Sequence, residues 1–135
     1  MIKFNETFKS SSLSNYLNDI SKTNNFINNK YRQMCSDFIT KNYDYKYFLL
    51  THSATAALEI AAMVLKEDVK LHNSRVIMPS YTFSSTANAF LRSNYKIKFI
   101  DLNPKNMMAD VSKVSFKKND IFVPVHYAGS YFDFD

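Results

Sequence analysis

The segment from Thr55 to Lys66 constrains the fold of this chain more than any other. It is built from Ala, Leu, Ile, Met and Val, and Glu59 is its only charge before Lys66. A helix that is apolar on nearly every side must be covered on nearly every side, by a sheet on one face and by further elements on another. The segment therefore predicts a core helix within a layered domain.

Short apolar runs that stop at turn residues alternate with helical patterns along the chain. This alternation predicts an α/β fold with a mostly parallel sheet, helices on both faces and right-handed crossovers. We expect strands at residues 47–50, 75–78, 96–100 and 121–125, and helices near residues 13–20, 31–41, 55–66 and 84–91. We divide the chain into an amino-terminal helical segment with a loop, 1–45, and an α/β part, 46–135.

Glycine is scarce, with 1 in the chain where about 9 would be average for this length. Turns must therefore rely on Asn, Ser and Asp. We expect Asn94 to take the turn before the third strand. The Asn-rich stretch from Asn24 to Tyr31 can form a loop because Asn tolerates left-handed backbone better than other non-glycine residues.

The number of elements bears on whether the domain is complete. With 135 residues the chain is long enough for one ordinary domain. Four short strands and about four helices do not suffice to cover the apolar helix on all sides. The final residues, 131–135, hold three aromatic side chains and two carboxylates, which is unlike a solvated terminus. We therefore expect the chain to be part of a larger, here incomplete, domain.

Composition argues against several classes of protein. Lys and Arg number 17 and Asp and Glu 12, a net charge of +5, and the lysines are scattered, so a basic nucleic-acid binder ranks only third among our hypotheses. The single cysteine, Cys35, cannot form an internal disulfide, which favours the reducing cytoplasm. No apolar run approaches the roughly 20 residues that span a bilayer, so we expect no membrane association. We assign no metal ligands.

The first candidate site is Ser53 to Leu58, where a strand is expected to end and the core helix to begin. Free backbone amides and the positive end of the helix dipole converge there, so a phosphate could bind, with a hydroxyl from Ser53 or Thr55. The alternative is that Ser53 is simply an N-cap, a role that contributes about 1 kcal/mol. No glycine-rich nucleotide motif is present, which argues against nucleoside triphosphates and NAD.

The second candidate is Met78 to Ala89, just beyond the carboxyl end of a strand, where ligands bind in open α/β sheets. An aromatic side chain there could stack on a planar heterocycle. In the alternative reading, Phe83 is a core residue and Ser84 a helix cap. His126 also follows a strand, and a hydrogen-bonded structural role is the commoner one for such a histidine.

Three motifs in this order resemble the DegT/DnrJ/EryC1/StrS family of sugar aminotransferases, which use pyridoxal 5'-phosphate (PLP). They are Ser53-Ala54-Thr55, the stretch from Pro79 to Phe83, and the stretch from Val125 to Gly129. The resemblance covers nearly the whole chain. It implies the amino-terminal part of the large PLP-binding domain of a fold-type I transferase, to which residues 46–135 would belong.

The resemblance also implies site residues and substrates. Ser53, Ala54 and Thr55 would form the cofactor-phosphate site, and Phe83 would pack against the pyridine ring. The residues of the second motif look most like those of the branch that aminates dTDP-4-oxo-6-deoxy-D-glucose with glutamate. That reaction yields dTDP-4-amino-4,6-dideoxygalactose. Such enzymes serve lipopolysaccharide O-antigen and enterobacterial common antigen synthesis, and a homodimer is implied for the full-length form.

The family's cofactor-binding lysine and its aspartate at the pyridinium nitrogen both lie downstream of the Val125–Gly129 motif. We find no counterpart for either and assign no catalytic residue in this chain. Expressed alone, it is expected to be inactive, and poorly soluble because strand edges and the flank of the apolar helix would be exposed. The alternative is a non-catalytic remnant or interaction module of the same fold.

Overall fold

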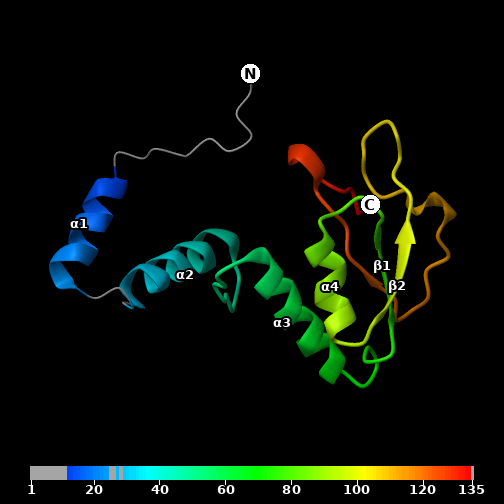
Figure 1. Ribbon diagram of the computed structural model, residues 1–135, viewed down its shortest axis with the longest axis horizontal. Helices are drawn as coiled ribbons and strands as arrows, with labels where there is room; N and C mark the ends of the chain where they lie inside the picture. The colour runs from blue at the N-terminus through cyan, green and yellow to red at the C-terminus, as the bar shows by residue number, and fades with distance from the viewer. Residues whose placement is uncertain (1–11, 25–26, 28, 135) are drawn as a thin grey trace. The chain divides into compact units, whose positions relative to one another are not determined.

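The computed structural model describes residues 12–24, 27 and 29–134, which form two compact units, Met1–Leu50 and Thr51–Asp135 (Figure 1). The division at residue 45 stays a prediction. No described helix is both long enough and apolar enough to cross a membrane.

The first unit contains the two helices α1, Leu13–Thr23, and α2, Asn29–Tyr43, as the sequence predicts. Asn24 ends α1 with a φ of 47°, in the left-handed conformation expected of Asn. Residues 25, 26 and 28 of the Asn-rich stretch lie outside the described part of the chain. The rings of Tyr16 and Tyr31 meet edge to face at 5.3 Å between centroids, and Asp19 accepts hydrogen bonds from Lys30 and Tyr31.

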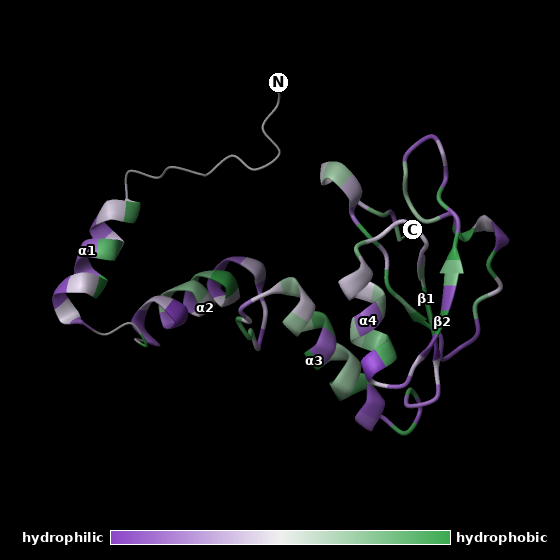
Figure 2. Cartoon of the chain, viewed as in Figure 1, coloured by the Kyte–Doolittle hydropathy of each residue, from purple (hydrophilic) through white to green (hydrophobic). Residues whose placement is uncertain are grey.

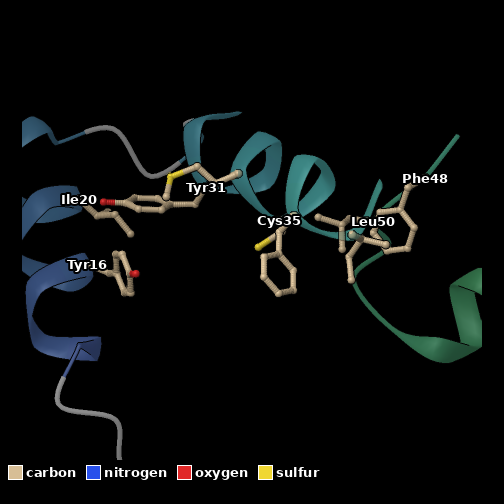
Figure 3. A pocket seen from close by; sticks show the side chains of 9 residues that line it. Tyr16, Ile20, Tyr31, Cys35, Phe48 and Leu50 are labelled. Carbon is tan, nitrogen blue, oxygen red and sulfur yellow. The ribbon is translucent and has the colours of Figure 1, made fainter. Parts of the chain in front are cut away.

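An apolar hollow of about 620 Å³ lies in this unit (Figure 3). Side chains from α1, α2 and the segment that follows α2 line it, among them Tyr16, Ile20, Tyr31, Cys35, Phe48 and Leu50.

The prediction of a strand at 47–50 is wrong. The described part of the chain contains no partner strand for this segment, and Tyr47 and Leu49 are 82% and 68% exposed. A strand is defined by backbone hydrogen bonds to a neighbouring strand, and a single extended segment leaves its amides and carbonyls without such bonds. The apolar sequence of this segment alone therefore does not produce a strand.

The second unit contains a parallel sheet of three strands, β1 Arg75–Pro79, β2 Lys96–Ile100 and β3 Ile121–Phe122, in the order β2-β1-β3. The first two confirm the predicted strands. β3 is shorter than the expected 121–125 because the pairing ends after Val123, whose amide still donates to the Ile77 carbonyl at 2.9 Å. Pro124 follows, and proline has no amide with which to continue a ladder.

Side chains of β1 alternate between the two faces of the sheet. Val76 and Met78, both completely buried, pack with Ala62 of α3, Ala54–Glu67, and with Phe90 of α4, Ser84–Arg92. On the opposite face, Ile77 packs with Ile100 at the end of β2, Phe122 of β3, and Ala109 and Phe132 from the segments that follow these strands. The predicted α/β architecture with a parallel sheet is thereby confirmed.

The apolar character of α3 exceeds what the described chain covers. Apolar residues follow one another along the helix (Figure 2), yet only Ala62 is buried. Met63 and Val64 are 62% and 65% exposed. The apolar flank expected from the sequence is therefore open in the described residues.

Left-handed turns fall mainly on Asn and Asp, as the scarcity of glycine predicts. Asn24, Asp44 and Asn94 all have a positive φ, and Asn94 lies between α4 and β2 as expected. Met107 and Ala128 also adopt positive φ, which costs more for side chains that cannot bond to the nearby backbone.

An ion pair joins β1 to the turn before β3. The guanidinium of Arg75 donates from Nε and Nη2 to the two carboxylate oxygens of Asp120, whose side chain is 3% exposed. The hydrogen bond from Arg75 lowers the pKa of Asp120 below its ordinary value of 3.8. The Asp120 carboxylate therefore binds a proton more weakly in the folded state than in the unfolded chain.

We predict that Asp120→Asn lowers the melting temperature near neutral pH. Because the folded pKa is depressed, the contribution of the pair is complete above the unfolded pKa of about 4 and is lost as pH falls through the folded value. Thermal unfolding from neutral to acid pH should therefore show the variant and the parent converging. Asp101→Asn, which removes an exposed carboxylate at the other end of the sheet, is the control and should shift the melting temperature little at any pH. An Asp120→Asn deficit that persists unchanged at low pH would contradict the assignment.

Candidate functional site

The start of α3 is built as a capped helix terminus. Ser53 is extended, with φ −159° and ψ 158°, and its Oγ accepts a hydrogen bond from the Ala56 amide at 3.1 Å. The Ser53 carbonyl accepts the first helical bond, from Ala57, and also a bond from the Thr51 hydroxyl. The cap reading of Ser53 is therefore correct, and the cap holds the first turn in place.

The cap leaves two backbone donors at the helix start. No described residue accepts a hydrogen bond from the amides of Ala54 or Thr55, which precede the first helical bond. The first turn contains no acidic side chain, so nothing within it neutralises the positive end of the helix dipole. Ala54 is exposed and Thr55 half-buried. Two open amides and a nearby hydroxyl suit a phosphate group, and we call Ser53, Ala54 and Thr55 the phosphate seat.

The phosphate seat lies at the edge of the sheet where ligand sites form. α3 and α4 run side by side in the same direction, since Glu59 pairs with Arg92 at 2.9 Å while Lys66 donates to the Asn94 carbonyl (Figure 1). α4 begins just beyond the carboxyl end of β1. Both helix starts are therefore at the carboxyl edge of the strands, where ligands bind in open α/β sheets.

Phe83, the residue expected against a pyridine ring, is the N-cap position of α4 and is 78% exposed. Its exposure contradicts the core reading and leaves the ring face available. Thr55 instead shares a hollow of about 480 Å³ between the two helices with Ser85 and Asn88, and Phe83 does not line that hollow. The role of Phe83 toward a cofactor ring stays a prediction.

A tyrosine pair unites two motifs that are far apart in sequence. The hydroxyls of Tyr81 and Tyr127 lie 3.2 Å apart, and their ring centroids are separated by 5.2 Å. The hydrogen bond with Tyr81 raises the pKa of Tyr127 above its ordinary value of 10.0. The sequence analysis missed this pair. The available signal was that each tyrosine follows a strand, but the adjacency of β1 and β3 is needed to bring them together.

His126 has the structural role expected for it. Its Nδ1 accepts a hydrogen bond from the Phe132 amide at 2.8 Å. This bond holds the segment that places Phe132 against Phe122, with 5.1 Å between the ring centroids.

Nearly all of the sequence matches the profile of a protein family. The profile of the DegT/DnrJ/EryC1/StrS aminotransferase family matches residues 9–135. The chain belongs to this family. The resemblance drawn from its three motifs is thereby confirmed at the level of the family.

Two curated relatives are sugar aminotransferases by name. The chain is 34% identical over 86 residues to the UDP-4-amino-4-deoxy-L-arabinose–oxoglutarate aminotransferase of Shewanella sediminis, a match that covers 62% of this chain and 21% of that protein. It is 27% identical over 122 residues to the 3-oxo-glucose-6-phosphate:glutamate aminotransferase of Bacillus subtilis, with 88% and 27% covered. The chain thus spans about a fifth to a quarter of the length of these relatives.

Solved structures confirm the fold class. NtdA of Bacillus subtilis with bound cofactor PMP has a TM-score of 0.77 at 25% identity. The match covers 93% of this chain and 30% of the NtdA chain. The GDP-4-keto-6-deoxy-D-mannose-3-dehydratase of E. coli with bound hydrated PLP has a TM-score of 0.70 at 15% identity, with 79% and 28% covered. The described residues therefore form part of a PLP-type transferase fold.

We predict that Ser53→Ala destabilises the unit Thr51–Asp135 by about 1 kcal/mol, because the Ala56 amide loses its acceptor. Ser53→Gly should cost only a few tenths of a kcal/mol, since glycine is itself a tolerated N-cap. Chemical denaturation followed by circular dichroism measures both. Ser84→Ala is the matched control, because Ser84 is also near a helix start but caps nothing. If Ser53→Ala and Ser84→Ala changed the free energy of unfolding equally, the Ser53 cap would not contribute to stability.

Proposed function

We propose that this chain supplies the phosphate seat of a PLP-dependent aminotransferase that acts on a nucleotide-linked 4-keto-6-deoxy sugar. The observation that carries the proposal is the pair of open amides at Ala54 and Thr55, held by the Ser53 cap at the carboxyl edge of a parallel sheet. Membership of an aminotransferase family and the PLP or PMP in two structural neighbours support the cofactor.

Each residue of the seat has a distinct part in this proposal. The amides of Ala54 and Thr55 donate to phosphate oxygens, the Thr55 hydroxyl adds a third donor, and Ser53 positions all three by fixing the first turn. Phe83 supplies a ring face at the start of α4. PLP, when bound, supplies the electron sink for transamination, and the chain's own contribution is to anchor and orient it.

The substrate proposal is narrower than the family. Residues 77–83 and 85–90 resemble the branch that aminates dTDP-4-oxo-6-deoxy-D-glucose. The names of the two relatives pair an amino sugar or a keto sugar with oxoglutarate or glutamate. We therefore propose glutamate as amino donor and a product used in O-antigen or enterobacterial common antigen synthesis. We assign none of these 135 residues as the lysine amine or the carboxylate that transamination requires, and we propose a cytoplasmic homodimer as the working form.

The phosphate seat is tested by removing one of its amides. Ala54→Pro deletes the Ala54 donor yet suits the first helical position, and Ser53 already has the extended backbone preferred before proline. A hydrogen bond to a charged group contributes about 1.5–3 kcal/mol, so affinity for pyridoxamine 5'-phosphate should fall about tenfold or more. NMR shifts of the α3 amides measure binding without any reaction.

Two controls accompany this test. Ala54→Gly changes the same side chain but keeps the amide, and it should leave affinity nearly unchanged. Pyridoxamine, which lacks the phosphate, should bind the parent and Ala54→Pro equally weakly. If the parent and Ala54→Pro bind pyridoxamine 5'-phosphate alike, the phosphate seat is wrong.

The substrate proposal has a separate test. A polypeptide that contains these 135 residues together with the required amine should convert dTDP-4-oxo-6-deoxy-D-glucose and glutamate to a 4-amino sugar nucleotide and 2-oxoglutarate, as detected by mass spectrometry. Conversion of a UDP-linked pentose or of a free keto-sugar phosphate in preference would overturn the substrate while leaving the phosphate seat intact.

A further inference from the structure

Tyr81 and Tyr127 lie at the carboxyl edge of the sheet, the edge that also carries the phosphate seat. Tyr81 follows the end of β1 at Pro79, and Tyr127 begins the short 3-10 helix η2, Tyr127–Gly129, which follows β3. Because β1 and β3 are parallel neighbours in the sheet, the segments that follow them leave it at the same edge. The two tyrosines are therefore where ligands bind in open α/β sheets, although the phosphate seat does not use them.

The residues on either side of Tyr81 are tied to neighbouring elements. The Ser80 amide donates to the carbonyl of Ile100, the last residue of β2, at 2.8 Å. The hydroxyl of Thr82 donates to the hydroxyl of Thr86 in α4 at 3.0 Å. The backbone that carries Tyr81 is thereby held between the sheet and α4 before any ligand binds.

Tyr127 supports Tyr81 from the other motif. Their hydroxyl oxygens lie 3.2 Å apart, and their rings meet at 5.2 Å between centroids with the planes inclined at 56°. The segment of Tyr127 is held in turn, because Nδ1 of His126 accepts a hydrogen bond from the Phe132 amide. Turning either tyrosine ring away would break both the hydrogen bond and the ring contact between them.

The pair uses only one of its two hydroxyl hydrogens. One hydroxyl donates to the other, and no further described residue forms a hydrogen bond with either of them. The hydrogen bond with Tyr81 raises the pKa of Tyr127, which is the direction expected of the donor because donation stabilises its protonated form. Tyr81 is therefore the acceptor, and its own hydrogen is available to a ligand. Accepting one hydrogen bond also strengthens a hydroxyl as the donor of another.

The chemistry of the pair suits a sugar better than a phosphate. Tyr81 and Tyr127 are 52% and 38% exposed, so each presents part of an apolar ring face together with a polar tip. A sugar ring offers CH groups that pack on such faces and hydroxyl or keto oxygens that accept hydrogen bonds. A phosphate needs charged or multiple donors, whereas the pair offers one neutral donor.

We propose that Tyr81, held by Tyr127, donates a hydrogen bond to an oxygen of the substrate's sugar ring and so orients the sugar at the carboxyl edge of the sheet. The inference rests on the proposed function, from which it takes the sugar nucleotide as substrate. Tyr81 is then a substrate-binding residue, and Tyr127 is a positioning residue that acts through Tyr81.

The test is a titration of the 135-residue chain with dTDP-6-deoxy-D-glucose, which keeps the sugar but lacks the reactive keto group, followed through backbone amide signals. Saturable shifts are expected at Tyr81 and Tyr127. Tyr81→Phe should weaken this binding about three- to tenfold, the effect of one lost hydrogen bond. Tyr127→Phe should weaken it less than about twofold, because Tyr81 keeps its hydrogen and loses only its support. Neither variant should change the affinity for dTDP, which has no sugar at the diphosphate.

A purely structural role of the pair gives a different result. Each phenylalanine variant removes the same bond between Tyr81 and Tyr127, so both should lower the melting temperature by the same amount. Only a ligand contact makes their effects on binding unequal. Equal weakening by the two variants, or equal affinity of the parent for dTDP and for dTDP-6-deoxy-D-glucose, overturns the proposal. Tyr43→Phe removes an exposed hydroxyl from α2 and is the control, which should change neither binding nor melting temperature.

Failure of this inference is distinguishable from failure of the phosphate seat. Tyr81→Phe should bind pyridoxamine 5'-phosphate as tightly as the parent does, because it leaves the seat intact. A parent chain that binds pyridoxamine 5'-phosphate but shows no saturable binding of dTDP-6-deoxy-D-glucose overturns the role of Tyr81 alone. If Ala54→Pro leaves pyridoxamine 5'-phosphate binding unchanged while Tyr81→Phe still weakens the sugar nucleotide, the seat is wrong and the contact of Tyr81 with the sugar stands.

Discussion

The central position of β1 organises the second unit of this protein. Because β1 pairs in parallel with β2 on one side and β3 on the other, its alternating side chains form two clusters, one against α3 and α4 and one with the end of β2 and the chain that follows it. The parallel pairing also aligns the strand ends. The motif after β1 and the motif after β3 thereby meet at one edge, where Tyr81 contacts Tyr127, while Arg75 meets Asp120 at the other.

The candidate phosphate seat follows from this alignment. At the carboxyl edge, the donors are backbone amides that the geometry of a capped helix leaves open, so charge comes from the helix dipole. At the amino edge, the contact between Arg75 and Asp120 is instead made by side chains, and the sheet contributes only their positions.

Sequence reasoning succeeded where local patterns decide the outcome. The helices and the strands β1 and β2 follow from apolar spacing, and Asn94 takes the left-handed turn for which few residue types are suited. The strand expected at Tyr47–Leu50 fails because a strand exists only by pairing with another, and its apolar sequence carries no information about a partner. β3 shortens for a local reason that the sequence did contain, the proline at position 124.

The amino-acid sequence by itself determined the family, the α/β class and the Ser53 cap at the start of α3, because motifs and a helix cap depend on residues close together along the chain. Only the tertiary structure decided that Tyr81 contacts Tyr127 and that Arg75 holds Asp120. These contacts join residues that are 46 and 45 positions apart in the sequence. They arise from the order of strands in the sheet, which local periodicity does not encode.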